Sequence, residues 1–255
     1  MNLVQSVQQA WHDDTHVPEG DAGAPGPEPR ESASAVLALR LAIGALALAL
    51  PLLVIAVDLF IPTFDWHLRN SLSAYYYAGS REVFTEGLAA TGALLLAFKA
   101  FDRRLEFWLT SAAGALAILV AFFPTKSCDD CGASNALQAA IGADIVREIH
   151  YASAFTMIGL LALVCVLWAA LERHTGDGGD RFRALHIASA AVIGVAVTFG
   201  VVMFLSEALF EQELLVVEWV SVWAFAGSWL FVGPAFRERE RCRVRSRRPA
   251  SARRR

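Results

Sequence analysis

Charged residues are scarce in this sequence. They make up 18% of its 255 residues, whereas 56% are hydrophobic, and in an average soluble domain about a quarter of the residues are charged. A chain of this composition has too few polar side chains to cover a folded surface with groups that water solvates. The shortage therefore argues against a water-soluble enzyme and directs attention to the apolar stretches.

The motifs of several enzyme classes are missing. The sequence has no glycine-rich phosphate loop followed by lysine, no H-E-x-x-H pair of zinc-binding histidines and no G-x-S-x-G nucleophile turn. Chemistry driven by nucleotides is therefore unsupported, and we expect no cofactor.

Cysteine is also rare, with four residues in the chain. Cys128 and Cys131 form a single C-x-x-C motif around two aspartates, in a segment that we expect on the outer side of a membrane. An oxidising compartment favours a local disulfide between them. A metal site is the alternative, but it would need further ligands, and no second cysteine pair or histidine lies nearby in the sequence.

Long apolar stretches are what the sequence does contain. They cover residues 35–60, 84–101, 105–124, 150–171, 184–205 and 214–236. Each is close to the roughly 20 residues that carry an α-helix across a bilayer, and stretches such as 112–121 lack the alternation of a membrane-spanning strand. The weakest is 84–101, because Glu86 and Lys99 lie near its ends. The sequence predicts an all-α, polytopic membrane bundle of about six transmembrane helices, with five or seven spans as alternatives.

Small and helix-breaking residues occur within these stretches. Pro51 lies inside the first one and is expected to kink its helix, which is tolerated because neighbouring helices can satisfy the freed carbonyl. Five glycines are expected to let helices approach closely: Gly87, Gly92, Gly114, Gly194 and Gly200.

The two ends of the chain differ from this apolar domain. Residues 1–34 combine four prolines with several glycines and mostly acidic charges, so we expect a disordered acidic arm rather than a signal peptide, whose leader would be basic. Residues 237–255 contain ten arginines and two glutamates and are expected to form a disordered tail. The six-helix domain would occupy residues 35–236.

Lysine and arginine are unevenly distributed around the expected spans. The chain has 22 of them, and ten lie in the tail. Eight more lie on the same side of a six-span bundle, at Arg30, Arg40, Lys99, Arg103, Arg104, Arg173, Arg181 and Arg183. Since cytoplasmic loops carry the excess of these residues, we expect a multi-pass protein of the cell membrane with both termini in the cytoplasm.

The arginine tail has two interpretations. It is typical of a solvated topology signal, and it is also typical of a segment that binds anionic lipid of the inner leaflet, at roughly 1 kcal/mol per arginine close to the surface. Nucleic-acid binding is disfavoured, because no base-stacking aromatic residues accompany the arginines.

The outer side of the same bundle gathers polar side chains at the ends of several spans. The candidate ligand-binding residues are Ser71, Ser73, Tyr76, Arg81, Glu86, His150 and Glu218. Ionisable groups within spans are costly and tend to face protein or a water-filled cavity, and Glu218 lies inside the last stretch. The leading hypothesis is a non-enzymatic membrane protein, with membrane lipids as partners, whose outward polar cluster binds a lipid head group or a small solute.

Other interpretations of these residues stay open. Glu218 and His150 are also typical of hydrated or hydrogen-bonded side chains at the membrane interface, and the tyrosines at 75–77 of an interfacial aromatic belt. A metal-dependent intramembrane lipid hydrolase would use Asp58, His67, His150 and Glu218 as metal ligands. Similar hydrolases, of the alkaline ceramidase and progestin-receptor type, use three histidines where this outer side offers two. A small transporter is the second alternative, although no convincing pair of inverted repeats supports it.

Several short motifs suggest a family. They are S-L-S-A-Y-Y-Y at 71–77 followed by Arg81 and Phe84, A-F-F-P-T at 121–125, His150 at the start of a span, and Glu218 followed by W-A-F-A-G-S-W-L at 223–230. In these the chain resembles an uncharacterised bacterial family of six-span membrane proteins related to the domain of unknown function 998, and more distantly the DRAM and Sfk-like proteins. The resemblance implies a six-helix bundle with no established activity. It does not extend to the acidic arm, the C-x-x-C motif or the arginine tail.

Overall fold

The computed structural model describes residues 29–60, 68–98, 104–125, 135–172, 180–206 and 213–231. The secondary structure of these residues is entirely helical, as predicted. The α-helices are α2 (Pro29–Phe60), α3 (Arg81–Ala97), α4 (Arg104–Phe122), α5 (Ala136–Ile141), α6 (Ala143–Glu172), α7 (Asp180–Leu205) and α8 (Glu213–Leu230), and the 3₁₀ helix η1 covers Ser73–Tyr77. Residues 1–28, the tail at 237–255, His67 and the cysteines Cys128 and Cys131 lie outside the described residues.

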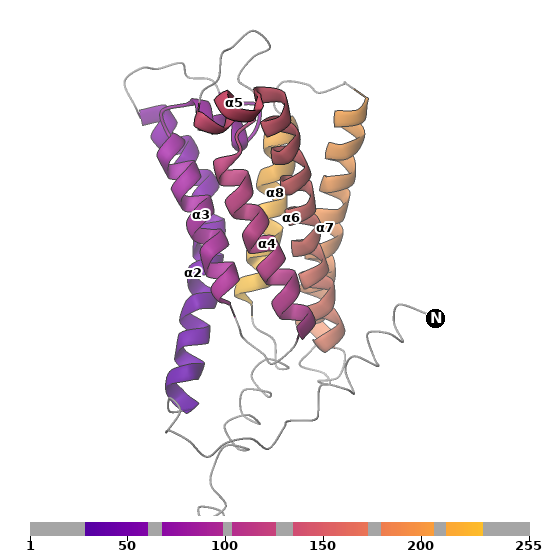
Figure 1. Ribbon diagram of the computed structural model, residues 1–255. Helices are drawn as coiled ribbons and strands as arrows, with labels where there is room; N and C mark the ends of the chain where they lie inside the picture. The colour runs from indigo at the N-terminus through magenta and orange to yellow at the C-terminus, as the bar shows by residue number, and fades with distance from the viewer. Residues whose placement is uncertain are drawn as a thin grey trace, which may run out of the picture.

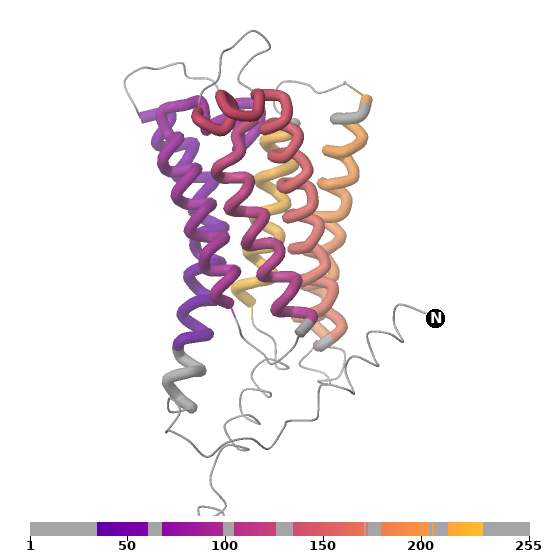
Figure 2. Tube along the Cα trace, viewed as in Figure 1, coloured from indigo at the N-terminus to yellow at the C-terminus, as the bar shows by residue number. Residues whose placement is uncertain are grey.

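The six longer helices form a closed ring. Helix α2 packs on α3 and α8, α3 on α4, α4 on α6, α6 on α7, and α7 on α8. The trace runs back and forth along the length of the bundle (Figure 2). The short elements η1 and α5 lie together at one end (Figure 1), which we call the η1 end; the other is the opposite end.

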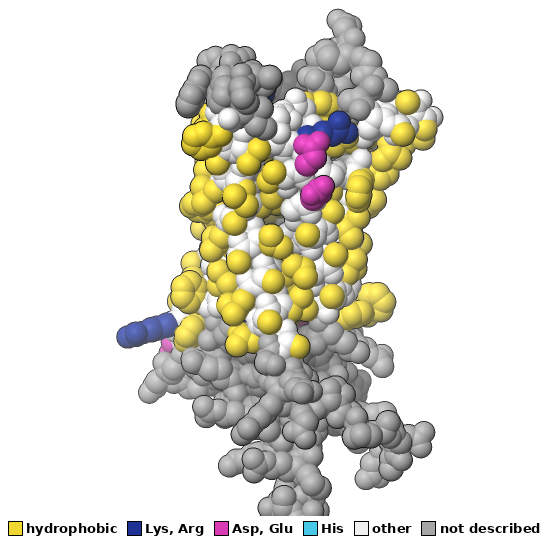
Figure 3. Space-filling view, turned by 90° about the vertical axis from the view of Figure 1, so that its left-hand side faces the viewer, with side chains coloured by type: hydrophobic (Ala, Val, Ile, Leu, Met, Phe, Trp, Pro, Cys, Tyr) yellow, Lys and Arg dark blue, Asp and Glu magenta, His cyan; other side chains and the backbone are white. Residues whose placement is uncertain are grey.

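Four of these helices are long and apolar enough to cross a membrane, over Ala35–Phe60, Leu105–Phe122, Ala143–Ala170 and Asp180–Met203. The α8 segment Leu214–Leu230 is apolar but shorter. On the side seen in Figure 3, hydrophobic side chains cover much of the height, and charged ones gather toward the two ends. Large apolar side chains such as Trp108 and Val195 are exposed, as expected where lipid takes the place of water. The structure therefore indicates a multi-pass membrane protein.

Two helix boundaries differ from the expected ones. Helix α2 begins at Pro29, inside the segment expected to be disordered, because the fixed φ of proline and its missing N–H suit the first position of a helix. Helix α6 begins at Ala143 rather than near 150. It follows Gly142, where the chain turns between α5 and α6. The φ angle of Gly142 is +93°, a positive value that glycine adopts more readily than other residues.

The glycines bear out the packing expectation in part. A Cβ added to Gly92 of α3 would lie 2.6 Å from the carbonyl oxygen of Gly114 in α4, so these two helices touch through their backbones. Gly87 faces Leu50 of α2 at close range. The expectation is wrong for Gly194, which has no neighbouring atom within 4 Å of its Cβ position, because it lies on the exposed side of α7.

Candidate functional site

A cavity of about 100 Å³ lies within the bundle toward the η1 end. Helices α2, α3, α4, α6 and α8 and the start of η1 supply its walls, which are mainly aliphatic. Its polar side chains are Ser73, Thr91, His150 and Glu218, and no lysine or arginine is among the described residues that line it. Three of the residues predicted from the sequence, Ser73, His150 and Glu218, thus meet at one cavity although they come from three separate segments.

Glu218 joins α8 to the start of η1. Its Oε2 atom accepts a hydrogen bond from the backbone N–H of Leu72 at 2.5 Å, at a helix start where backbone donors have no partner within the helix. A second link lies one turn earlier, where the N–H of Leu215 donates to the carbonyl of Asn70 at 2.9 Å. These bonds hold the carboxylate at the cavity wall.

Ser73 belongs to a small hydroxyl pair. The Oγ atoms of Ser71 and Ser73 lie 3.0 Å apart, and Ser71 Oγ also accepts from the N–H of Ala74 at 3.0 Å. Both serines are buried. Ser71 thus shapes the start of η1 and positions Ser73, which is the serine that lines the cavity.

His150 is 1% exposed and is fixed by the end of α4. Its Nδ1 atom lies 2.6 Å from the carbonyl oxygen of Phe123. Because a carbonyl only accepts, Nδ1 must carry the proton and donate it. In the neutral ring, Nε2 then has a lone pair, and the carbonyl of Val120 is a second backbone group close to the ring. Besides the hydroxyls of Ser73 and Thr91, the polar part of the cavity therefore contains the Glu218 carboxylate and the His150 imidazole.

Tyr76 and Arg81 form a separate contact beside the cavity. The Tyr76 hydroxyl accepts from Arg81 Nη2 and from Asn135 Nδ2, the latter at 3.0 Å. The Arg81 guanidinium also lies 4.2 Å from the centre of the Tyr76 ring. These contacts attach α3 and the start of α5 to η1, and neither residue lines the cavity. Glu86, another predicted ligand residue, is exposed on α3 and does not reach the cavity either.

Tyr77 and Gln138 tie η1 to the end of α4. The Tyr77 hydroxyl donates to the carbonyl of Thr125, and Gln138 Nε2 donates to the same carbonyl at 3.0 Å and to the Tyr77 hydroxyl at 3.1 Å. The Tyr77–Thr125–Gln138 bonds hold η1 in place at this end of the bundle.

The metal-ligand set of the hydrolase hypothesis is not assembled by the described residues. Asp58 accepts from Arg69 Nε at 3.3 Å and from the N–H of Gly79 at 3.0 Å, and it does not line the cavity with His150 and Glu218. Its carboxylate thus serves to fasten the segment before η1. In the described part of the chain no group of three or more His, Cys, Asp or Glu residues could hold a metal ion.

A second polar cluster, at the opposite end, was not predicted as a site. It contains Arg40, Glu106, Glu172 and His186, each 4% exposed or less. From the sequence, Arg40 is expected only to be one of the cations on the cytoplasmic side. The available signal was that Arg40 and Glu106 fall inside the expected spans 35–60 and 105–124, where ionisable residues are costly and tend to be functional.

Comparison of the chain with known proteins gives no functional information about the cavity or the second polar cluster. No protein-family model, no curated protein and no solved structure matches the chain, so these comparisons do not support the resemblance to the family related to the domain of unknown function 998, which stays a prediction.

Proposed function

We propose that the protein is a membrane receptor or carrier for a small, largely apolar group that bears one hydrogen-bond donor, a hydroxyl or an ammonium. The supporting observation is that Glu218 and His150 line the same, mainly aliphatic cavity. A carboxylate and an imidazole without a cationic partner among the described lining residues favour a ligand that donates. They disfavour a phosphate or carboxylate, because like charges repel and a buried anion needs donors. Among the lipid head groups and small solutes considered from the sequence, the proposal therefore favours those that donate a hydrogen bond and carry no negative charge.

The size of the cavity supports a compact ligand. At about 100 Å³ it is somewhat smaller than the apolar cavity of about 150 Å³ that takes up benzene in a well-studied engineered protein. The occupant is therefore a free small molecule or the end of a longer lipid, and both sources share the same donor chemistry.

The proposal includes a six-span topology. Helices α3 and α8 would cross the membrane together with the four longer apolar helices, since both are members of the same closed ring. With the arginine-rich side in the cytoplasm, both termini would be cytoplasmic and the η1 end would face outward. Two reporter proteins, one active only in the cytoplasm and one active only outside it, are fused separately to the C-terminus and tested in intact bacterial cells. A cytoplasmic C-terminus predicts activity of the first reporter and not of the second.

Ligand binding is tested with three small probes that share one branched carbon skeleton: isobutanol, isobutylamine and isobutyrate. Binding to the full-length protein in lipid nanodiscs is measured by ligand-observed NMR. We expect the alcohol or the amine to bind and isobutyrate not to bind. Glu218→Gln should weaken the amine at least tenfold. Its matched control is Glu148→Gln, which removes an exposed carboxylate paired with Arg147 on α6 and should have no effect.

Two outcomes would overturn the donor-ligand proposal. One is isobutyrate binding as well as the alcohol and the amine do, and the other is equal binding of the amine to wild type and Glu218→Gln. Native mass spectrometry of the same nanodiscs separates the two ligand sources. If a lipid stays bound to wild type and is lost in Glu218→Gln, the natural ligand is part of a lipid. If the probes bind and no lipid is retained, the natural ligand is a free solute.

A further inference from the structure

The buried cluster at the opposite end joins four helices through ionisable side chains. Arg40 comes from α2, Glu106 from α4, Glu172 from α6 and His186 from α7, and all four are buried. This cluster is separate from the cavity, whose lining includes none of these residues.

Arg40 is held by two tryptophans. Its Nε donates to the carbonyl of Trp229 at 2.6 Å, and the Trp229 indole N–H donates back to the carbonyl of Arg40 at 2.9 Å. The guanidinium lies 4.1 Å from the centre of the Trp168 ring and 5.4 Å from that of Trp229. Such cation–π contacts, together with the hydrogen bonds, fix the position of the positive charge.

Glu106 is bound on one side only. Its Oε1 atom accepts from the Trp168 indole N–H at 2.9 Å. Its Oε2 atom is buried and has no hydrogen-bond partner in the described part of the structure. An ionised carboxylate is costly to bury when one of its oxygens lacks a donor, because neither water nor protein then compensates its charge.

Arg40, Glu172 and His186 complete the cluster. Glu106 and Glu172 both lie close enough to Arg40 to interact with its charge. His186 approaches Ser228 through Nδ1, at 2.7 Å from the hydroxyl oxygen, and its ring lies against Trp168. Within the described structure, none of these groups donates a hydrogen bond to Glu106 Oε2.

A proton fits this oxygen better than a metal ion does. A metal ion requires several oxygen or nitrogen ligands, and the described residues contain no group of three or more His, Cys, Asp or Glu residues that could hold one. A proton requires a single oxygen, and Glu106 Oε2 has no hydrogen-bond partner in the described structure.

We propose that Glu106 is a buried, exchangeable proton-binding site, with the proton on Oε2, at the opposite end of the bundle. The groups around it are Arg40 of α2, Trp168 and Glu172 of α6 and His186 of α7. The proton comes from water and returns to it, so no bond between heavy atoms changes. This site is independent of the ligand proposed for the cavity.

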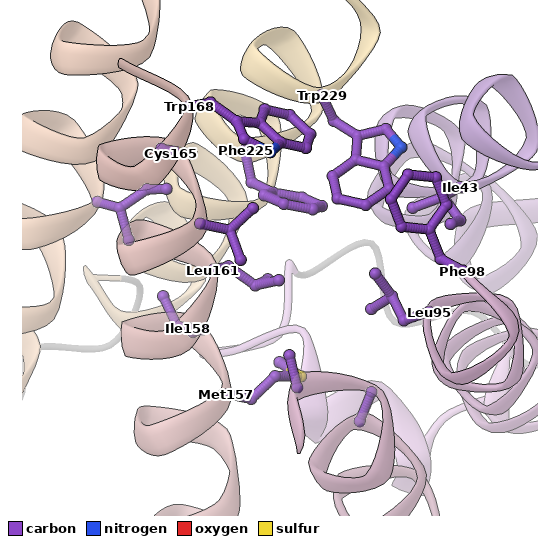
Figure 4. Close-up of a cluster of buried hydrophobic side chains, with 14 residues drawn as sticks. Ile43, Leu95, Phe98, Met157, Ile158, Leu161, Cys165, Trp168, Phe225 and Trp229 are labelled. Atoms are coloured by element: carbon purple, nitrogen blue, oxygen red, sulfur yellow. The ribbon is translucent and has the colours of Figure 1, made fainter. Parts of the chain in front are cut away.

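Aromatic rings in contact connect Trp168, which bonds to Glu106, with the wall of the cavity. Figure 4 shows Trp168, Phe225, Trp229 and Phe98 together, with Leu161 and Leu95 beside them. The ring centres of Trp168 and Trp229 are 4.9 Å apart, and those of Phe225 and Trp229 are 5.1 Å apart. Phe225 also lines the cavity.

Infrared spectroscopy of the full-length protein in nanodiscs tests the proposal directly. A protonated carboxyl has a C=O stretching band that an ionised one lacks and that shifts in D₂O when the proton exchanges. We expect wild type to show such a band at neutral pH, with a shift in D₂O. Glu106→Gln should remove it. The exposed control Glu148→Gln should keep it.

A second variant covers the case in which Glu106→Gln fails to fold. Glu106→Asp keeps a carboxyl at the site, so the band should persist at a changed frequency. Persistence of every protonated-carboxyl band in Glu106→Gln would overturn the proposal, as would a band that does not shift in D₂O. So would stabilisation of wild type by sodium or potassium that is lost in Glu106→Gln, since the site would then hold a metal cation.

Discussion

Arg40 of α2 and Trp229 of α8 are bound to each other twice, each side chain donating to the backbone carbonyl of the other residue. The two residues are 189 positions apart, and their pairing closes the ring of helices at the opposite end. Since both carbonyls belong to helices, the bonds join the first and last long helices without interrupting the packing between them.

Trp229→Phe should therefore destabilise the bundle. The change removes the indole donor and leaves space beside Phe98 and Trp168, which the Trp229 ring contacts. We expect the free energy of unfolding to fall by about 2 kcal/mol, measured by denaturant titration in mild detergent. Trp108→Phe is the matched control, because Trp108 is 65% exposed, and it should change stability by less than about 0.5 kcal/mol. Equal losses in the two variants would show that the reciprocal bonds contribute nothing.

The contact between Gly92 and Gly114 gives a second prediction. A methyl group at Gly92 would meet the backbone of α4, and backbone cannot move aside as a side chain can. Gly92→Ala should separate α3 from α4 and lower the free energy of unfolding by about 1 to 3 kcal/mol. Gly159→Ala is the control, since no atom lies within 4 Å of its Cβ position, and it should leave stability unchanged or higher. The close approach of α3 and α4 is refuted if both variants unfold at the same temperature.

The membrane-spanning helices can be predicted from the sequence because the lipid bilayer strongly restricts which sequences can cross it. A span must satisfy its own backbone and present apolar side chains over about 20 residues, and such stretches are visible without a structure. The sequence does not settle the number of spans. Helix α3 has only 17 residues and is not among the four helices that are long and apolar enough to cross a membrane. The sequence also does not show that Gly92 packs against another helix and Gly194 does not. The sequence of one helix does not reveal which of its faces contacts a neighbouring helix.

The candidate site was predictable only as a set of polar residues on one side. Ser73, His150 and Glu218 do line one cavity, but nothing in the sequence links Glu218 to Leu72, 146 positions away. Tyr76 and Arg81 share the same end and instead bond to each other. Arg40 shows a related limit, because an arginine near the end of an apolar stretch has the same sequence pattern whether it reaches water or is buried beside two tryptophans.

Tyr75 predicts a response to alkaline pH. Burial is the main cause that raises the pKa of its phenol, and Asp58 adds to it, while Arg69 acts in the opposite sense. Because the folded state disfavours the phenolate, this contribution to stability is present below the ordinary pKa of about 10 and is lost as the pH rises above it. Tyr75→Phe should therefore lose less stability than wild type between about pH 8 and about pH 11. Unfolding midpoints at both pH values measure this, and equal losses would contradict it.

Filling the cavity gives the most discriminating prediction, because two measurements should move in opposite directions. Ala154 lines the cavity one turn after His150 on α6, and the longer side chain in Ala154→Leu would extend into it. The free energy of unfolding should rise by about 1 kcal/mol, as for other cavity-filling changes, while binding of isobutanol or isobutylamine should be lost. Ala152→Leu adds the same atoms on the exposed side of α6 and should alter neither. A variant that binds the probe as wild type does would place the ligand elsewhere. A variant that loses binding and stability together would show a distorted fold, so only higher stability with lost binding locates the ligand in this cavity.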